Sequence, residues 1–246
     1  MRLEGKTAIV TGGASGFGEG IARKFIAEGA NVMIADLNMA DDLVAELGKS
    51  ARAVKANVAQ DSSVQAMVQA TLDAFGRIDI LINNAGTTHL PTPMEDVSED
   101  DFDKVFAVNC KSVYLTAKHI VPLLKKQGSG AILNVASTAG VSPRPRLNWY
   151  NASKGWMNTA TKAMAVELAP EGIRVNAINP VAGETPLLKS FMGEDTPEIR
   201  AKFLSTIPLG RFSTPEDMAN AACFLCSEEA SMITGVCMEV DGGRCI

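Results

Sequence analysis

The chain has 246 residues, of which 46% are hydrophobic and 21% charged, and its formal net charge is −5 at pH 7. This length fits one large α/β domain, residues 1–246, and is short for two independent domains. The negative charge and the lack of a dense lysine and arginine run argue against nucleic acid or an anionic membrane as the main partner. No apolar stretch reaches the roughly 18 residues of a membrane helix, and the first residues lack a signal-peptide layout, so we expect a cytoplasmic protein.

Apolar strand-like runs alternate with amphipathic helical patterns along the chain. This alternation is typical of βαβ units and predicts a doubly wound, mostly parallel seven-stranded sheet, a Rossmann fold, with helices on both faces. The expected strands are 7–10, 31–35, 52–56, 80–82, 131–136, 174–178 and 236–240. The expected helices cover about 21–26, 64–72, 99–126, 150–169 and 215–226. Residues 183–208 carry Gly, Pro and Thr breakers after a strand's carboxyl end, and we expect them to form a lid over a bound substrate.

A glycine-rich stretch, TGGASGFG at residues 11–18, lies between the first strand and the first helix. Glycines allow a tight turn and let the backbone approach a pyrophosphate at the positive end of a helix. Asp36 closes the second strand, where its carboxylate can accept hydrogen bonds from the ribose of adenosine. The same carboxylate repels a 2′-phosphate, and Leu37 is not basic, so the sequence favours NAD(H) over NADP(H).

With this stretch in place, the chain resembles the short-chain dehydrogenase/reductase superfamily, in its shorter single-domain branch, over essentially its whole length. The sequence NNAG at residues 83–86 follows the fourth strand, and Asn109 lies in the long central helix. Ser137 follows the fifth strand, and Tyr150 and Lys154 form a Tyr-x-x-x-Lys motif thirteen residues later. These motifs occur in the family's order and on the family's elements.

The resemblance implies proton transfer at a hydroxyl or carbonyl group. Tyr150 and Lys154 are one helical turn apart and project from one face, so the ammonium is expected to lower the pKa of the phenol. Tyr150 would then act as the general acid or base. Ser137 would hold the substrate oxygen, and Asn109 would anchor water that reloads the proton through Lys154. The expected catalytic residues are Asn109, Ser137, Tyr150 and Lys154.

The resemblance also implies cofactor contacts from several loops. Adenine contacts would come from Asn57 and Val58; the family more often has Asp at position 57, so an amide oxygen would meet the adenine amine. The segment PVAGET at residues 180–185 has valine where the family usually has glycine. The expected cofactor-binding residues are Gly12, Ser15, Gly16, Phe17, Gly18, Asp36, Leu37, Asn57, Val58, Asn84, Ala85, Gly86, Tyr150, Lys154, Pro180, Gly183 and Thr185.

The substrate is less sharply defined. Arg144 and Arg146, each preceded by proline, could bind a carboxylate, sulfonate or phosphate, or else face solvent or a neighbouring subunit. The expected substrate-binding residues are Ser137, Arg144, Arg146 and Tyr150. We predict an NAD(H)-dependent oxidoreductase that interconverts a secondary alcohol and a ketone in a sugar, polyol or hydroxy acid. The alternatives are a 3-oxoacyl-(acyl-carrier-protein) reductase, a sugar-nucleotide epimerase or dehydratase, and a non-catalytic dinucleotide-binding protein.

Three further expectations concern cysteines, metal binding and assembly. The CFLC pattern at residues 223–226 lies in a helical pattern and is interpreted as buried helix cysteines, not as a redox pair. His89 and His119 lack ligand-spaced companions, so no metal site is expected. The helix opening at Thr214 and the sequence VDGG at residues 240–243 resemble the family's subunit-packing region, which implies a homotetramer.

Overall fold

The computed structural model of the protein describes all 246 residues. Seven strands run parallel in the order β3-β2-β1-β4-β5-β6-β7, which confirms the predicted doubly wound Rossmann fold. Each strand lies within two residues of its predicted bounds. The strands are β1 (Thr7–Thr11), β2 (Asn31–Asp36), β3 (Ala51–Lys55), β4 (Ile80–Asn83), β5 (Gly130–Val135), β6 (Ile173–Pro180) and β7 (Cys237–Val240).

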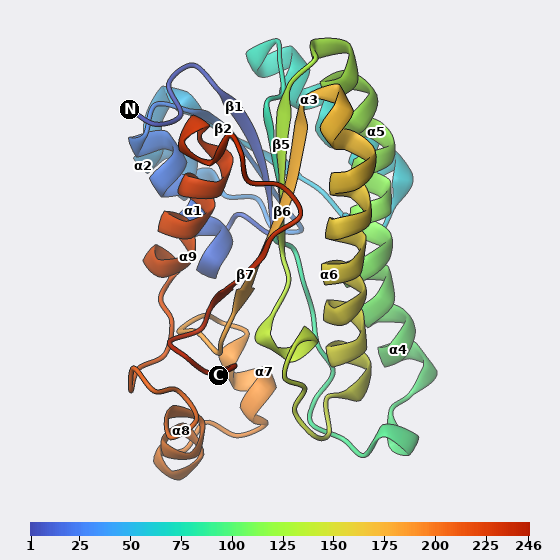
Figure 1. The fold of residues 1–246 in the computed structure, drawn as a ribbon, viewed down its shortest axis with the longest axis vertical. Coiled ribbons are helices and arrows are strands. Elements are labelled where there is room, and N and C mark those ends of the chain that lie inside the picture. Colours follow the sequence, from blue (N-terminus) through green and yellow to red (C-terminus); the bar gives the residue numbers. More distant parts are fainter.

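Helices cover both faces of the sheet (Figure 1). One face carries α1 (Gly16–Ala27), α2 (Asp41–Leu47) and α9 (Pro215–Cys226). The other carries α3 (Asp61–Phe75), α4 (Glu99–Phe106), α5 (Ser112–Gln127) and α6 (Asn148–Leu168). Two short helices, α7 (Leu188–Met192) and α8 (Pro197–Leu204), lie beyond the carboxyl ends of the strands. The short helix α2 was not predicted, and it buries only Leu43 among its residues.

The two faces of the sheet have separate hydrophobic cores. Successive residues of a strand point to opposite faces, so in β1 Val10 packs in the core with Phe25 of α1, and Ile9 packs in the core with Ile120 of α5. All five residues of β1 are buried. Strands buried on both faces need near-continuous apolar sequence, which explains why the runs in β1, β2 and β4 were easy to recognise.

The helix predicted over residues 99–126 is not uniform. The α4 and α5 helices are joined by a π-helical turn, Ala107–Lys111, that contains the buried Asn109. Single π turns inserted in α-helices occur frequently at functional sites. The turn therefore marks the part of this long helix that faces the candidate site.

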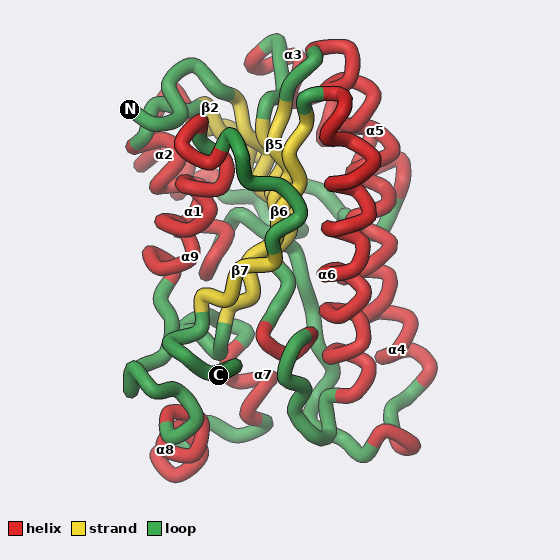
Figure 2. The backbone as a smooth tube through the Cα atoms, in the orientation of Figure 1, coloured by secondary structure: helices red, strands yellow, loops and turns green.

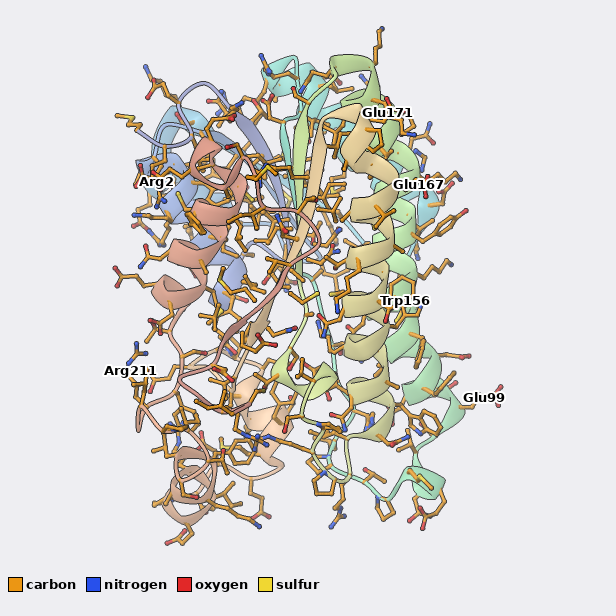
Figure 3. All side chains as sticks on the ribbon, in the orientation of Figure 1. Arg2, Glu99, Trp156, Glu167, Glu171 and Arg211 are labelled. Atoms are coloured by element: carbon orange, nitrogen blue, oxygen red, sulfur yellow. The ribbon has the colours of Figure 1, made fainter.

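Loops gather at the carboxyl ends of the strands, where α7, α8 and the C-terminus also lie (Figure 2). Ligands of open parallel sheets bind at this edge, beside the point where the strand order reverses. Here the reversal falls between β1 and β4. Charged side chains such as Glu99 and Arg211 lie at the periphery of the molecule (Figure 3).

The cysteines of the CFLC pattern lie inside α9, and both are buried. Burial raises the pKa of the Cys226 thiol to about 12 and also raises the pKa of Cys223, the opposite of what a redox pair needs. This confirms their interpretation as buried helix cysteines. None of the helices is long and apolar enough to cross a membrane.

Candidate active site

The turn between β1 and α1 requires glycine at three positions. Gly12 and Gly16 have φ angles of 61° and 57°, in the left-handed region that other residues rarely adopt. At Gly18 the obstacle is space, because a Cβ atom there would lie 2.1 Å from the carbonyl oxygen of Gly12. The glycines therefore let the first turn of α1 fold directly onto the preceding loop.

We expect Gly18→Ala to lower the free energy of unfolding by roughly 1–3 kcal/mol, the usual cost of overpacking a rigid site. The matched control is Gly155→Ala in α6, where the nearest atom to the added methyl group is 3.7 Å away. That change should be neutral or stabilise the helix by up to about 1 kcal/mol. Urea unfolding of both variants measures the difference, and equal stabilities would contradict the close packing at Gly18.

Thr11 and Asn84 lock this turn to the end of β4. The Thr11 hydroxyl accepts hydrogen bonds from the backbone N–H groups of Asn84 and Ala85, at 3.0 and 3.1 Å. The Asn84 amide donates to the carbonyl oxygens of Thr11 and Gly12, at 2.9 and 3.0 Å. The glycine turn and the NNAG segment therefore form one rigid unit at the centre of the sheet edge.

Asp36 and Asn57 line the far end of the same edge. The Asp36 carboxylate accepts hydrogen bonds from the backbone N–H groups of Ala14, at 3.2 Å, and Asn38, at 3.1 Å. Ala14 belongs to the glycine turn, so this bond joins the end of β2 to the loop after β1. The Asn57 amide oxygen accepts a hydrogen bond from the N–H of Ala59 at 3.0 Å, so the atom expected to meet an adenine amine already has one partner.

The expected catalytic side chains converge beyond the ends of β4 and β5. Tyr150 is buried near the start of α6 and lines the same cavity as Ser137. The Lys154 ammonium donates to the Val135 carbonyl oxygen at 2.8 Å and lies 5.9 Å from the centre of the Tyr150 ring. The chain folds this way locally because Tyr150 and Lys154 lie one turn apart on the buried face of α6, which packs against β6.

Asn109 is committed to protein partners. Its amide nitrogen donates to the carbonyl oxygen of Thr87 and to the hydroxyl of Ser153, both at 2.9 Å. Its amide oxygen accepts from the N–H of Thr87 at 2.9 Å. Both amide protons are therefore used, and only the second lone pair of the oxygen is left to hold the water expected there. In this structure Asn109 mainly fixes the segment after Gly86 against α6.

The pKa values of Tyr150 and Lys154 are set by burial. Burial raises the pKa of Tyr150 to about 12, although the nearby Ser137 side chain acts in the opposite direction. Burial lowers the pKa of Lys154 to about 8. The net shift in this structure is therefore opposite to the lowering expected from the ammonium, and burial is its main cause. The Tyr150 hydroxyl keeps its proton at neutral pH.

A cavity of about 550 Å³ runs along this edge of the sheet. It joins Asp36 at one end to Ser137, Tyr150 and Lys154 at the other. Among the residues expected to bind a cofactor, Gly18 alone does not line it, since it packs behind the turn. Asn109 and Arg146 also lie outside the lining.

The structure of the segment after β6 explains how Val181 can occupy the position where the family usually has glycine. No residue of this segment has a positive φ angle, and Val181 is buried in a small core with Leu188 and Phe212. Gly183 instead makes the close approach, because a Cβ atom there would lie 2.3 Å from the ring of Phe17. Thr185 lines the cavity beside the glycine turn, against Gly16. In this chain, therefore, position 183 is the one in the segment that requires glycine, and position 181 accepts valine.

Helices α7 and α8 bring two aromatic rings to the cavity, Phe191 and Phe203. The ring centres of Phe191 and Tyr150 are 5.0 Å apart. Sequence reasoning missed both phenylalanines, although the spacing of Leu188 and Met192 could have indicated the anchored face of a short helix.

The structure separates the two arginines of the loop before α6. Arg144 lines the cavity, and its guanidinium lies 4.2 Å from the centre of the Phe203 ring. Arg146 is exposed and has a φ angle of 65°, which turns the chain so that its carbonyl oxygen accepts from the N–H of Thr92. The expected pairing of Arg144 with Arg146 at a substrate therefore does not occur within this structure.

Comparison with known proteins places this geometry in a family. A family model described as enoyl-(acyl-carrier-protein) reductase matches residues 12–244. The chain is 50% identical to 4-formylbenzenesulfonate dehydrogenase of Comamonas testosteroni, over 99% of each chain. It is 40% identical to 3-oxoacyl-(acyl-carrier-protein) reductase of Thermotoga maritima, over 100% of each chain.

A solved structure, a 3-ketoacyl-(acyl-carrier-protein) reductase from Brucella melitensis complexed with NADH, superposes with a TM-score of 0.94. It is 50% identical, and the match covers 99% of this chain and 100% of that one. The chain belongs to the short-chain dehydrogenase/reductase superfamily of oxidoreductases.

Proposed function

We propose that the protein is an NAD(H)-dependent oxidoreductase that interconverts a secondary alcohol and a ketone. The observation that carries this proposal is one continuous cavity lined by Asp36, the glycine turn, Ser137, Tyr150 and Lys154. A dinucleotide site and a proton-transfer group in one cavity are what such an enzyme needs. The Brucella relative with NADH bound supports the choice of a nicotinamide cofactor.

The residues present fit NAD(H). The N-terminal N–H groups of α1, which begins at Gly16, have no partners within the helix and suit a pyrophosphate. Ser15, before that turn, makes no side-chain capping bond and lines the cavity. Asp36 would bind the adenosine ribose hydroxyls, and Lys154 the ribose of the nicotinamide half. When bound, NAD(H) supplies the hydride acceptor or donor.

The chain's own residues handle the proton. Ser137 would hold the substrate oxygen beside Tyr150, and the protonated Tyr150 hydroxyl would donate to a carbonyl oxygen in the reductive direction. In the oxidative direction Tyr150 must first lose its proton, a step that positive charge nearby favours. Lys154, held by the carbonyl oxygen of Val135, places an ammonium close to the ring. Residues 183–208 would cover the substrate and exclude water.

Asp36 is proposed to decide between the two nicotinamide cofactors. Leu37 beside it is exposed and presents no positive charge to a 2′-phosphate. We expect the double variant Asp36→Ala, Leu37→Arg to change the ratio of kcat/KM for NADH to that for NADPH by roughly 10²–10³-fold toward NADPH, the effect of removing one ionic repulsion and adding one ionic contact. The control Asp41→Ala, in α2, should leave the ratio unchanged. A wild-type protein that prefers NADPH would contradict this assignment.

The substrate class is tested by a panel. Secondary alcohols, polyols, hydroxy acids and the matching ketones are assayed with NAD(H) and NADP(H), together with a 3-oxoacyl thioester. The Thermotoga relative keeps the oxoacyl reductase as the second candidate function. The name of the Comamonas relative describes a carbonyl group on a ring that carries a sulfonate, so aromatic anions belong in the panel. Tight NAD(H) binding without turnover of any compound would support a non-catalytic dinucleotide-binding protein.

A further inference from the structure

Two arginines without an acidic partner lie near one another: Arg144 lines the catalytic end of the cavity, and Arg244, which is outside the lining, hydrogen-bonds to the loop that carries Arg144. Arg144 comes from the loop before α6, and Arg244 comes from the C-terminal segment after β7. All ion pairs of the protein involve other cations. Two like charges held together in a partly buried place are unfavourable unless an anion joins them.

Arg144 is held in place with much of its hydrogen-bonding capacity unused. Its guanidinium stacks over the Phe203 ring, and one of its nitrogens makes a long bond of 3.4 Å to the Thr206 hydroxyl. The aromatic face thus holds the guanidinium group in place, and Arg144 lines the cavity. Burial and the nearby charge of Arg244 lower the pKa of Arg144 to about 10, so the group still carries its proton at neutral pH.

Arg244 is bonded to the loop that carries Arg144, although it is not among the residues that line the cavity. One of its terminal nitrogens donates to the Ser142 hydroxyl at 3.1 Å, which ties the C-terminal segment to the loop that carries Arg144. Its Nε atom is buried and has no hydrogen-bond partner. The nearest acid in the sequence, Asp241, accepts hydrogen bonds from the backbone N–H groups of Gly243 and Cys245 instead. A buried donor without a partner is costly and rare in folded proteins.

We infer that Arg144 and Arg244 form a binding site for an oxyanion, a carboxylate or a sulfonate, at the end of the substrate remote from its reacting carbon. The inference rests on the proposed function, because it assumes that the substrate oxygen lies at Ser137 and Tyr150. A planar oxyanion suits two guanidinium edges, which can each donate two hydrogen bonds. Arg244, from the far end of the chain, replaces Arg146 as the partner of Arg144.

The apolar lining of the cavity indicates what the body of the substrate is like. Leu147, Phe191 and Phe203 line the same cavity as Tyr150 and Arg144 and offer apolar or aromatic surface. Phe191 packs against the Tyr150 ring, and Phe203 packs against Arg144, so each of the two polar groups has an aromatic ring beside it. A flat apolar or aromatic body with a carbonyl or hydroxyl group at one end and an oxyanion at the other fits this layout.

The first experiment measures binding without turnover. Benzoate, benzenesulfonate and the neutral benzamide are titrated into the wild-type protein, with NADH present, by isothermal titration calorimetry. We expect the two anions to bind roughly tenfold or more tightly than benzamide, the effect of a charge-assisted hydrogen bond. Arg144→Gln and Arg244→Gln should each remove this preference, and Arg146→Gln, at the exposed neighbour, should keep it.

The second experiment measures reduction of para-acetylbenzoate, para-acetylbenzenesulfonate and the neutral para-acetylbenzamide with NADH. We expect Arg144→Gln and Arg244→Gln to raise KM for the anionic ketones by roughly 10–100-fold, with kcat nearly unchanged. KM for the amide should stay within a few-fold. Arg146→Gln should behave as the wild type with all three ketones.

The two experiments separate this inference from the proposed function. If no ketone is reduced but the two arginine variants still lose the preference for the anions, the oxyanion site stands and the proposed reaction fails. If anions and amides bind and react equally well in the wild type, the oxyanion site is overturned while the reaction stands. A preference for the anions that survives in both Arg144→Gln and Arg244→Gln also overturns the site.

Discussion

Tyr150→Phe should reduce kcat by roughly 10²–10⁴-fold, the range that a positioned general acid contributes. The change removes one hydroxyl and leaves the ring, which is buried and packed against Phe191. The pKa of the hydroxyl is raised to about 12, so at neutral pH it is a proton donor that no solvent group replaces inside the cavity. The affinity for NADH should change little, because the backbone of the glycine turn and Asp36 are untouched.

The chain provides its own control for this experiment. It has only two tyrosines, and the other, Tyr114, is 59% exposed on α5. Tyr114→Phe should leave kcat, KM and stability as in the wild type. Initial rates of NADH oxidation and NADH binding, followed by its fluorescence, are measured for both variants. A near-normal kcat for Tyr150→Phe with intact NADH binding would refute the proposed role of the hydroxyl.

Lys154→Met should lower kcat by roughly 10²-fold or more. The same change should raise the free energy of unfolding at neutral pH. The catalytic loss follows because the ammonium beside Tyr150 and the contact with a bound nicotinamide ribose both disappear. The stability gain follows because burial lowers the pKa of Lys154 from 10.5 to about 8. A shift of this size corresponds to a folding penalty on the order of 3 kcal/mol for the charged form.

The pKa of Lys154 determines how the stability of the protein changes with pH. Between pH 8 and pH 10.5 the unfolded chain binds a proton at Lys154 that the folded chain does not, so this group makes stability rise with pH. The penalty is fully present below pH 8 and is gone above pH 10.5. The stability advantage of Lys154→Met over the wild type should therefore shrink through this window.

The contribution of Lys154 is obtained from the difference in unfolding free energy between variant and wild type. This difference is needed because buried thiols change the stability with pH in the opposite direction. Burial raises the pKa of Cys110 and Cys226, which makes stability fall as pH rises past the ordinary thiol value. Urea unfolding at several pH values gives the difference, with Lys162→Met, an exposed lysine of the same helix, as the control. A constant difference, or a wild type that is more stable than the variant at neutral pH, would contradict the buried lysine as described.

The sequence was sufficient for features that depend on local pattern. The glycine turn, Asp36 and the Tyr-x-x-x-Lys spacing each lie at a strand end or on one helix face, so their placement follows from the sheet and from helix geometry. The strands buried on both faces are continuous apolar runs, which explains their accurate bounds. The hydrogen bonds between Thr11 and Asn84 join two such strand ends. The sequence predicts that these two ends lie close together, but it does not predict the individual bonds.

The remaining features depend on contacts between distant segments. Arg244 lies 102 positions after Ser142 in the chain, and nothing in its neighbourhood in the sequence indicates that it meets the loop before α6. Arg146 looked equivalent to Arg144, but its left-handed backbone turns it away. The raised pKa of Tyr150 follows from burial, which depends on Phe191 and the short helices that pattern reading did not resolve.

The transfer of hydrogen between the substrate carbon and the nicotinamide is the central claim, and isotope labelling tests it most directly. A ketone reduced by the protein in the panel is incubated with NADH that carries deuterium at the transferring position, and the alcohol formed is analysed by mass spectrometry. We predict one deuterium on the carbon that bears the new hydroxyl group, and no labelled alcohol with Tyr150→Phe at matched times. Alcohol without deuterium, or equal labelled product from the variant, would contradict the proposed chemistry.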